Sequence, residues 1–214
     1  MTQLLDFLPF AAAACGIPQY LPQIRKVRRT GDTAGVSWPW TALTSVNNTA
    51  WFAYFTLSAY WTAMLPSSAA ALLAGVLAVM LARAGLVTRH AVVLIGCWTA
   101  LLVASVAVAG LPGLGTVLAA AFVIQVVPSI WTALRTRNPT GISRGTWGLV
   151  LGELACWLLY GLHRSDPRLI ALGVTGVTAA TLMLARTLKN VRPRNFPSGK
   201  ASRRTRRRSA RTPA

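Results

Sequence analysis

The chain is built from long apolar runs that are separated by short stretches rich in charge, glycine or proline. Because bilayer hydrocarbon is about 30 Å thick, a spanning helix needs roughly 20 mostly apolar residues. The pattern predicts seven such helices, over residues 5–23, 38–58, 66–83, 91–109, 115–134, 145–162 and 167–186. The predicted fold class is therefore an all-α membrane protein, not a soluble enzyme.

The charges of the chain predict its orientation. The sequence has 22 Lys and Arg against four acidic residues. The basic residues gather at 25–29, 83–89, 135–137 and from Arg186 onward, whereas the connections at 59–65 and 110–114 have none. Cytoplasmic loops carry the excess of Lys and Arg. We therefore expect a multi-pass protein of the inner (plasma) membrane, with the N-terminus outside and the C-terminus in the cytoplasm.

A repeat at a constant shift of 106 residues organises the chain. The pairs in register include Gln19 with Gln125, Pro22 with Pro128, Gly35 with Gly141, Ser37 with Ser143, Trp51 with Trp157 and Tyr54 with Tyr160. The first three predicted helices map onto the last three, and the unpaired fourth helix lets both copies run in the same direction. We thus predict three-helix repeats at 1–85 and 111–188, a linker helix at 86–110 and a basic tail at 189–214.

The motif residues of both copies carry a family resemblance. Pro22 and Gln23 precede a basic stretch, then a Gly-Val-Ser sequence, and then Trp51 and Tyr54. In these residues the chain resembles the PQ-loop superfamily, which includes SWEET and SemiSWEET sugar transporters, cystinosin-like amino-acid exporters and the KDEL receptor. The resemblance implies two parallel three-helix bundles joined by a linker helix. It also implies a substrate site on the central axis and alternating access to it.

The sequence departs from this family at three positions. In the second copy, Ser129 follows Pro128 where the motif would have Gln. Sugar-transporting members have an Asn on the third helix of each copy, and here those positions hold Ser67 and Gly173. The amide pair that binds sugar in those members is therefore absent.

Glu153 is the most informative candidate residue, because a charged group near the bilayer centre costs about 3 kcal/mol on insertion scales. Such groups usually face the bundle interior or water. The repeat partner of Glu153 is Asn47, and Asn48 lies beside it. We expect these groups to converge on the substrate pathway. The alternative is a neutral, protonated Glu153 that only bonds a neighbouring helix.

Tryptophan and proline pairs complete the predicted pathway. Trp51 and Trp157 are equivalent under the repeat and are expected to line the cavity, although Trp also collects at membrane interfaces. Pro22 and Pro128 each remove a backbone hydrogen bond, which makes a hinge or a static kink. Nearly one turn earlier, the amides of Gln19 and Gln125 are placed to satisfy the freed carbonyls or to bond another helix.

These features predict a transporter that moves a small polar solute, with a sugar as the family default. The alternatives are a proton-coupled amino-acid transporter and a non-transporting receptor or scaffold. Three isolated cysteines and two distant histidines predict no metal site, and the absence of a phosphate loop or paired carboxylates predicts neither a cofactor nor an enzyme. The basic tail fits anionic lipid better than nucleic acid. The pattern is compatible with a homo-oligomer.

Overall fold

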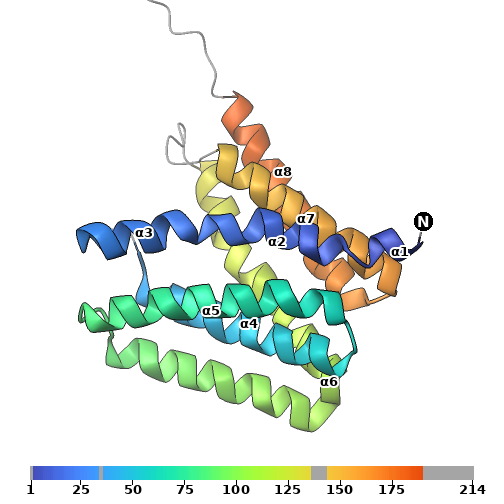
Figure 1. Ribbon diagram of the computed structural model, residues 1–214, viewed down its shortest axis with the longest axis horizontal. Helices are drawn as coiled ribbons and strands as arrows, with labels where there is room; N and C mark the ends of the chain where they lie inside the picture. Colours follow the sequence, from blue (N-terminus) through green and yellow to red (C-terminus); the bar gives the residue numbers. More distant parts are fainter. Residues whose placement is uncertain (1, 34–35, 136–143, 190–214) are drawn as a thin grey trace, which may run out of the picture.

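The computed structural model describes residues 2–33, 36–135 and 144–189, which form helices joined by short turns (Figure 1). The elements are α1 (Thr2–Leu5), α2 (Leu8–Gly16), the 3-10 turn η1 (Ile17–Gln19), α3 (Leu21–Thr30), α4 (Trp38–Leu57), α5 (Trp61–Arg83), α6 (Arg89–Arg135), α7 (Arg144–Arg164) and α8 (Pro167–Lys189). The segments long and apolar enough to cross a membrane are Gln3–Thr30, Trp61–Arg83, Arg89–Ile124, Gly145–Arg164 and Pro167–Arg186. By helix length and composition, the chain is a multi-pass membrane protein.

The described residues include five candidate spans, whereas the sequence predicts seven helices. Two features of the helices explain the difference. Helix α4 covers the span expected at 38–58, but polar residues such as Asn47 and Asn48 lower its hydropathy, and it is not one of the five. The spans expected at 91–109 and 115–134 form the single element α6, which breaks at Gly110 (φ 62°, ψ −156°). Figure 1 shows the chain turning back on itself at this break.

The first span is continuous but irregular. Its 3-10 turn η1 separates α2 from α3, and the N-terminal ends of η1 and α3 hold Pro18 and Pro22. Proline has no N–H to continue the α-helical ladder, which accounts for the change of helix type at this point. Helix α3 ends at Gly31, whose left-handed φ of 66° suits a residue without a Cβ.

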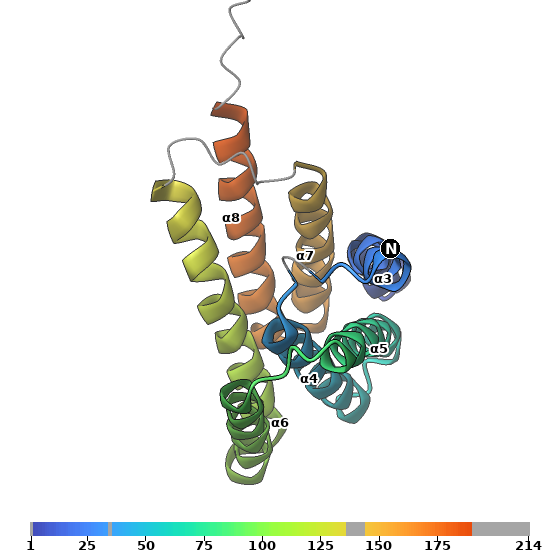
Figure 2. The ribbon, with the colours of Figure 1, turned by 90° about the vertical axis from the view of Figure 1, so that its left-hand side faces the viewer.

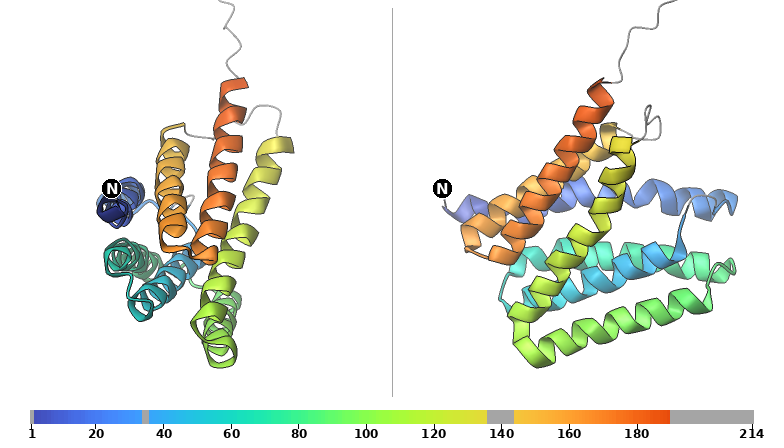
Figure 3. Two further views of the ribbon diagram at one scale, coloured as in Figure 1. Left: turned by 90° about the vertical axis from the view of Figure 1, so that its right-hand side faces the viewer. Right: turned by 180° about the vertical axis from the view of Figure 1, so that it is seen from behind.

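The contacts between helices follow one scheme in the two repeats, residues 1–85 and 111–188, which we call the first and second halves of the chain. Helix α5 packs against both α4 and the first span, and α8 packs against both α7 and α6. Figure 3 (left) shows α8 between α7 and the second part of α6. Between the halves, α2 contacts α7 and α4 contacts α6. The shift of 106 residues exchanges these last two contacts, as expected for halves related by an approximate two-fold axis.

The helical corners of the two halves share one backbone geometry. Ala59, between α4 and α5, has a φ of 56°, and Ser165, between α7 and α8, has a φ of 51°. In each corner the next residue, Tyr60 or Asp166, donates its N–H to the carbonyl five residues earlier, at 2.8 and 2.9 Å. Left-handed φ is uncommon for residues other than glycine. Its recurrence at equivalent positions therefore shows that both corners fold by the same turn.

The helices of the two halves are inclined to one another. In Figure 2, α3, α4 and α5 are seen nearly end-on while α7 and α8 run lengthwise. The crossing of α2 and α7 is made by small residues: a Cβ on Gly16 would lie 2.7 Å from Glu153 Oε1, and one on Gly152 would lie 3.2 Å from Cys15 Sγ. Such residues let two backbones approach closely over a short stretch, which permits an inclined crossing.

Candidate functional site

A cavity of about 230 Å³ lies between the two halves of the chain. Six residues singled out in the sequence line it: Asn47, Asn48, Trp51, Ser67, Glu153 and Trp157. A single water needs roughly 10–15 Å³ of such space, so the cavity can hold a small organic solute. Gly173 is not part of the lining. A Cβ on Gly173 would lie 2.5 Å from the backbone of Leu158, so this glycine serves the packing of α8 on α7.

Glu153 joins the first span to α7 inside the cavity. The side-chain amide of Gln19 donates to Glu153 Oε2 at 3.1 Å and to the carbonyl of Cys15 at 3.2 Å. Gln19 therefore has one of the two roles expected of it, the bond to another helix, and its second bond goes to a carbonyl in the last turn of α2. The carboxyl itself packs over Gly16, where any side chain would collide with it.

Asn47, the repeat partner of Glu153, is held differently. Its Oδ1 accepts a hydrogen bond of 2.6 Å from Trp98 Nε1, in the first part of α6. The predicted linker helix thus places a donor on a residue that lines the cavity. Asn48 and Ser67 bond carbonyls of their own helices, Thr44 at 2.9 Å and Ala63 at 3.0 Å.

Stacked aromatic rings form one end of the cavity. Phe55 stacks on Trp157 of the other half, with centroids 5.4 Å apart and planes 5° apart. It also stacks on Trp51 of its own helix, at 5.4 Å and 22°. The repeat-equivalent tryptophans are therefore brought together through one phenylalanine, since Phe55 has Gly161 as its counterpart in the second copy.

Beyond these rings, buried polar contacts join the two halves of the chain. We call this end of the cavity the closed end. Tyr54 donates to Asp166 Oδ2 at 2.5 Å, and the N–H of Arg168 donates to Asp166 Oδ1 at 3.0 Å. The exposed fractions of Tyr54, Tyr160 and Asp166 are 3%, 1% and 3%. Separating the two halves at this end would break the bond between Tyr54 and Asp166.

Further polar contacts surround the closed end. Tyr60 donates a long hydrogen bond of 3.4 Å to Asp166. The Arg164 guanidinium lies 4.5 Å from the centroid of the Tyr60 ring and 3.6 Å from Asp6. His163 Nε2 lies 3.0 Å from the same Asp6 carboxylate. The segment before α2 is thereby tied to the end of α7.

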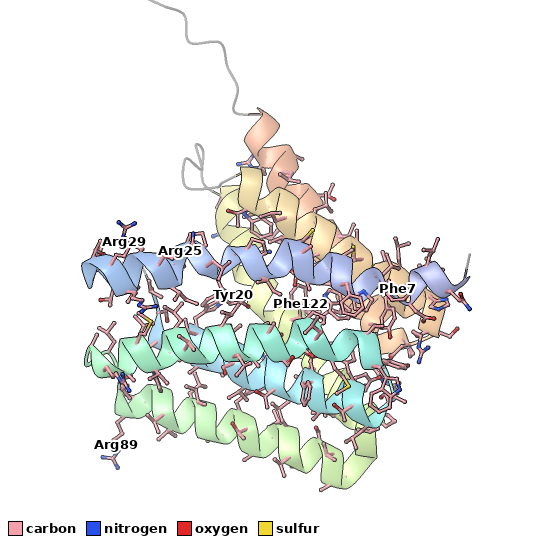
Figure 4. All side chains as sticks on the ribbon, in the orientation of Figure 1. Phe7, Tyr20, Arg25, Arg29, Arg89 and Phe122 are labelled. Atoms are coloured by element: carbon pink, nitrogen blue, oxygen red, sulfur yellow. The ribbon has the colours of Figure 1, made fainter. Side chains whose placement is uncertain are left out.

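The opposite end of the cavity is open. Its lining reaches Trp40, near the start of α4, and the Trp40 side chain is 53% exposed. In Figure 4, Arg25, Arg29 and Arg89 lie together at one end of the first set of helices, and Phe7 lies towards the other end. Tyr20 and Phe122 line the cavity between them. We call the end with these arginines the basic end, and the cavity extends towards it.

The remaining motif residues lie apart from the cavity or outside the description. Pro22 is exposed and Gln23 is half-buried, and neither lines the cavity. Gln125 and Pro128 belong to α6, but their side chains lie outside the described residues, as does the predicted tail from residue 190 onward. Within the described part of the chain, no group of three His, Cys, Asp or Glu side chains is placed to hold a metal ion.

Sequence reasoning missed two groups that the structure brings to the site. Trp98 lies in the unpaired helix, for which the repeat supplies no partner. Asp166 lies between Arg164 and Arg168, where the charge pattern alone indicates no role for it. A signal for the second was present, because Asp166 is the repeat equivalent of Tyr60, the residue just after the left-handed turn in the other half.

Comparison with known families supports the repeat motif in the first half. Residues 4–63 match the model of the PQ loop repeat. The matched stretch runs from α1 to the start of α5 and includes Gln19, Asn47 and Trp51 of the cavity region. No curated protein matches the chain in sequence.

Proposed function

We propose that this chain is a transporter of the inner (plasma) membrane that moves a small polar solute by alternating access between its two halves. The observation that carries the proposal is a solute-sized cavity lined by repeat-equivalent residues, Trp51 with Trp157 and Asn47 with Glu153. Transporters built from repeats place their substrate at the interface between the repeats, and this cavity has that position. The PQ loop repeat in residues 4–63 agrees with it.

The asymmetry between the ends of the cavity supports alternating access. One end is sealed by Tyr54, Tyr160 and Asp166, whereas the other reaches the exposed Trp40. If the basic end faces the cytoplasm, as the positive-inside rule favours, this conformation faces inward. Breaking the closed end and closing the basic end would then deliver the solute to the other side.

Uptake into liposomes tests the proposal. The purified full chain is reconstituted, and initial uptake is measured for a panel of sugars, amino acids and small amines. Trp51→Ala and Trp157→Ala are each expected to reduce uptake of the transported solute. Trp61→Ala is the matched control, because Trp61 is 68% exposed at the start of α5 and does not line the cavity. Uptake no faster than in empty liposomes for the whole panel would favour a receptor or scaffold.

A further inference from the structure

We propose that the solute in this cavity is a small organic cation, an ammonium group on an apolar body, and that it exchanges with a proton at Glu153. The inference rests on the transport function proposed above and specifies its substrate class. Three observations lead to it: the isolation of the Glu153 carboxyl from basic residues, the aromatic lining of the cavity, and the engagement of its other polar groups.

The carboxyl of Glu153 has no fixed countercharge in the spans. Apart from Glu153, no Asp, Glu, Lys, Arg or His occurs in residues 7–24, 33–82, 91–134, 145–162 or 169–185. Glu153 is half-buried, and a carboxylate at this depth in a membrane span is costly unless it is paired or protonated. The positive charge that neutralises Glu153 must therefore come through the cavity, as a proton or as a cationic solute.

The titratable groups that face Glu153 are neutral partners. They are the Tyr20 hydroxyl from the first span and the Cys156 thiol from α7, and Cys156 in turn interacts with Cys15 of α2. Helix α4 contributes the uncharged Asn47 and Asn48 to the lining, and the contribution of α8 is apolar. Gln19 donates one neutral hydrogen bond, which supports a carboxylate without cancelling its charge.

Aromatic side chains line the cavity, and among them Phe55 is stacked against Trp51 and Trp157. Tyr20, Trp40, Trp51, Phe55 and Trp157 all line it together with the carboxyl. The face of an aromatic ring attracts ammonium groups, and several rings around one site favour quaternary or alkylated ammonium ligands. The same rings would cover the apolar body of the solute.

Several polar atoms of the cavity are already used within the protein. Asn47 Oδ1 accepts from Trp98, the amide of Asn48 donates to Thr44, and the hydroxyl of Ser67 donates to Ala63. A neutral sugar needs several oriented donors and acceptors, whereas an ammonium needs one carboxylate and aromatic faces. The arrangement therefore favours the cation.

The exchange conserves charge at each step. In the empty cavity Glu153 holds a proton. When the cation binds, that proton leaves to water, and carboxylate and ammonium form a neutral pair. When the cation leaves on the other side of the membrane, a proton from that side returns to the carboxyl. One proton thus crosses in the opposite direction for each monovalent cation.

Choline and its neutral carbon analogue, in which a quaternary carbon replaces the nitrogen, test the inference with the purified full chain. We expect choline binding to release one proton per molecule bound, measured with a pH indicator in weakly buffered solution. Its apparent affinity should rise about tenfold per pH unit while the empty site is protonated, because one proton is exchanged. The carbon analogue should bind at least tenfold more weakly and release no proton.

Glu153→Gln should abolish proton release and lower choline affinity at least tenfold, since the amide keeps the acceptor for Gln19 but not the charge. Asp32→Asn is the matched control, because this acid lies outside the cavity and pairs with Lys26 at 2.7 Å. If Glu153→Gln fails to fold, Glu153→Asp takes its place as the test. This variant keeps a carboxyl and should still release a proton when choline binds. Equal binding of choline and its analogue, or choline binding without proton release, would overturn the inference.

The uptake assay separates the two proposals. Choline accumulation in liposomes with an acidic lumen, absent in Glu153→Gln, supports both. Uptake of glucose or alanine without any choline uptake overturns the cation inference and leaves the transport function standing. No uptake of choline, glucose or alanine, together with no choline binding, overturns both.

Discussion

The hydrogen bond from Tyr54 to Asp166 gives the sharpest test of how the cavity is closed. Tyr54→Phe removes only the hydroxyl that donates to Asp166 Oδ2 at 2.5 Å and keeps the ring that packs in the core. Asp166 would retain the N–H of Arg168 at 3.0 Å and the long contact from Tyr60 at 3.4 Å. The variant therefore weakens the closed end without emptying the packing around it.

The expected magnitude follows from the burial of both partners. A hydrogen bond to a charged group contributes about 1.5–3 kcal/mol, and each 1.4 kcal/mol changes an equilibrium tenfold. This bond joins the two halves, so it exists only while the end is closed. Its loss should shift the ratio of closed to open molecules by roughly tenfold to a hundredfold towards the open form. Tyr60→Phe removes the 3.4 Å contact with Asp166 and the hydroxyl's interaction with Arg164, and should shift the ratio less than Tyr54→Phe does.

Electron paramagnetic resonance distances measure this ratio. Spin labels at Leu57 and Leu162, which are 65% and 54% exposed near the ends of α4 and α7, report the separation of the halves at the closed end. Tyr54→Phe should add a population at longer distance, and Tyr60→Phe should add a smaller one. If the Tyr54→Phe distribution overlays that of the parent while its thermal unfolding is unchanged, the bond does not hold the cavity closed.

Three further predictions concern other contacts. Trp98→Phe removes the 2.6 Å donor to the cavity amide and should raise the KM for uptake about threefold, with Trp61→Ala unchanged. Gly173→Ala would bring a Cβ within 2.5 Å of the α7 backbone and should lower the free energy of unfolding by about 1–3 kcal/mol, measured by thermal melting. Gly148→Ala, with open space around it, should not destabilise the fold. In a cysteine-free variant, a cysteine at Ser202 should resist impermeant reagents applied outside intact cells; strong labelling there would contradict the proposed orientation.

The sequence predicts the helical class and the approximate ends of most helices because apolar runs and charged connections are local signals. The predicted linker helix ends at residue 110, and the break in α6 lies at Gly110, where a φ of 62° turns the chain. The inclination of the two halves depends on how Gly16 and Gly152 fit against side chains of the other half, which no pattern along the chain encodes.

For the site, the repeat was the strongest signal, because two-fold equivalence brings corresponding residues to one axis. It indicated Trp51, Trp157 and Glu153, all of which line the cavity. It carries no information on Trp98, which lies in the unpaired helix. It aligns Asp166 with Tyr60, so only the position and not the residue identity marks Asp166.

The two halves carry different residues at two positions, and these positions hold the acidic groups of the site. At the first, the amide of Asn47 is held by Trp98, while its counterpart Glu153 is held by Gln19 and keeps a carboxyl in the cavity. The second position is at the closed end, where Tyr54 bonds Asp166. The repeat-equivalent contact is between Tyr160 and Tyr60, whose rings meet edge to face at 5.9 Å. A symmetric pair of amides would bind a neutral solute equally from both halves. One acid and one amide instead make the cavity asymmetric, because a positive charge is attracted only to the half that carries the acid. We therefore expect selectivity for charge to depend on α7 and its contact with the first span.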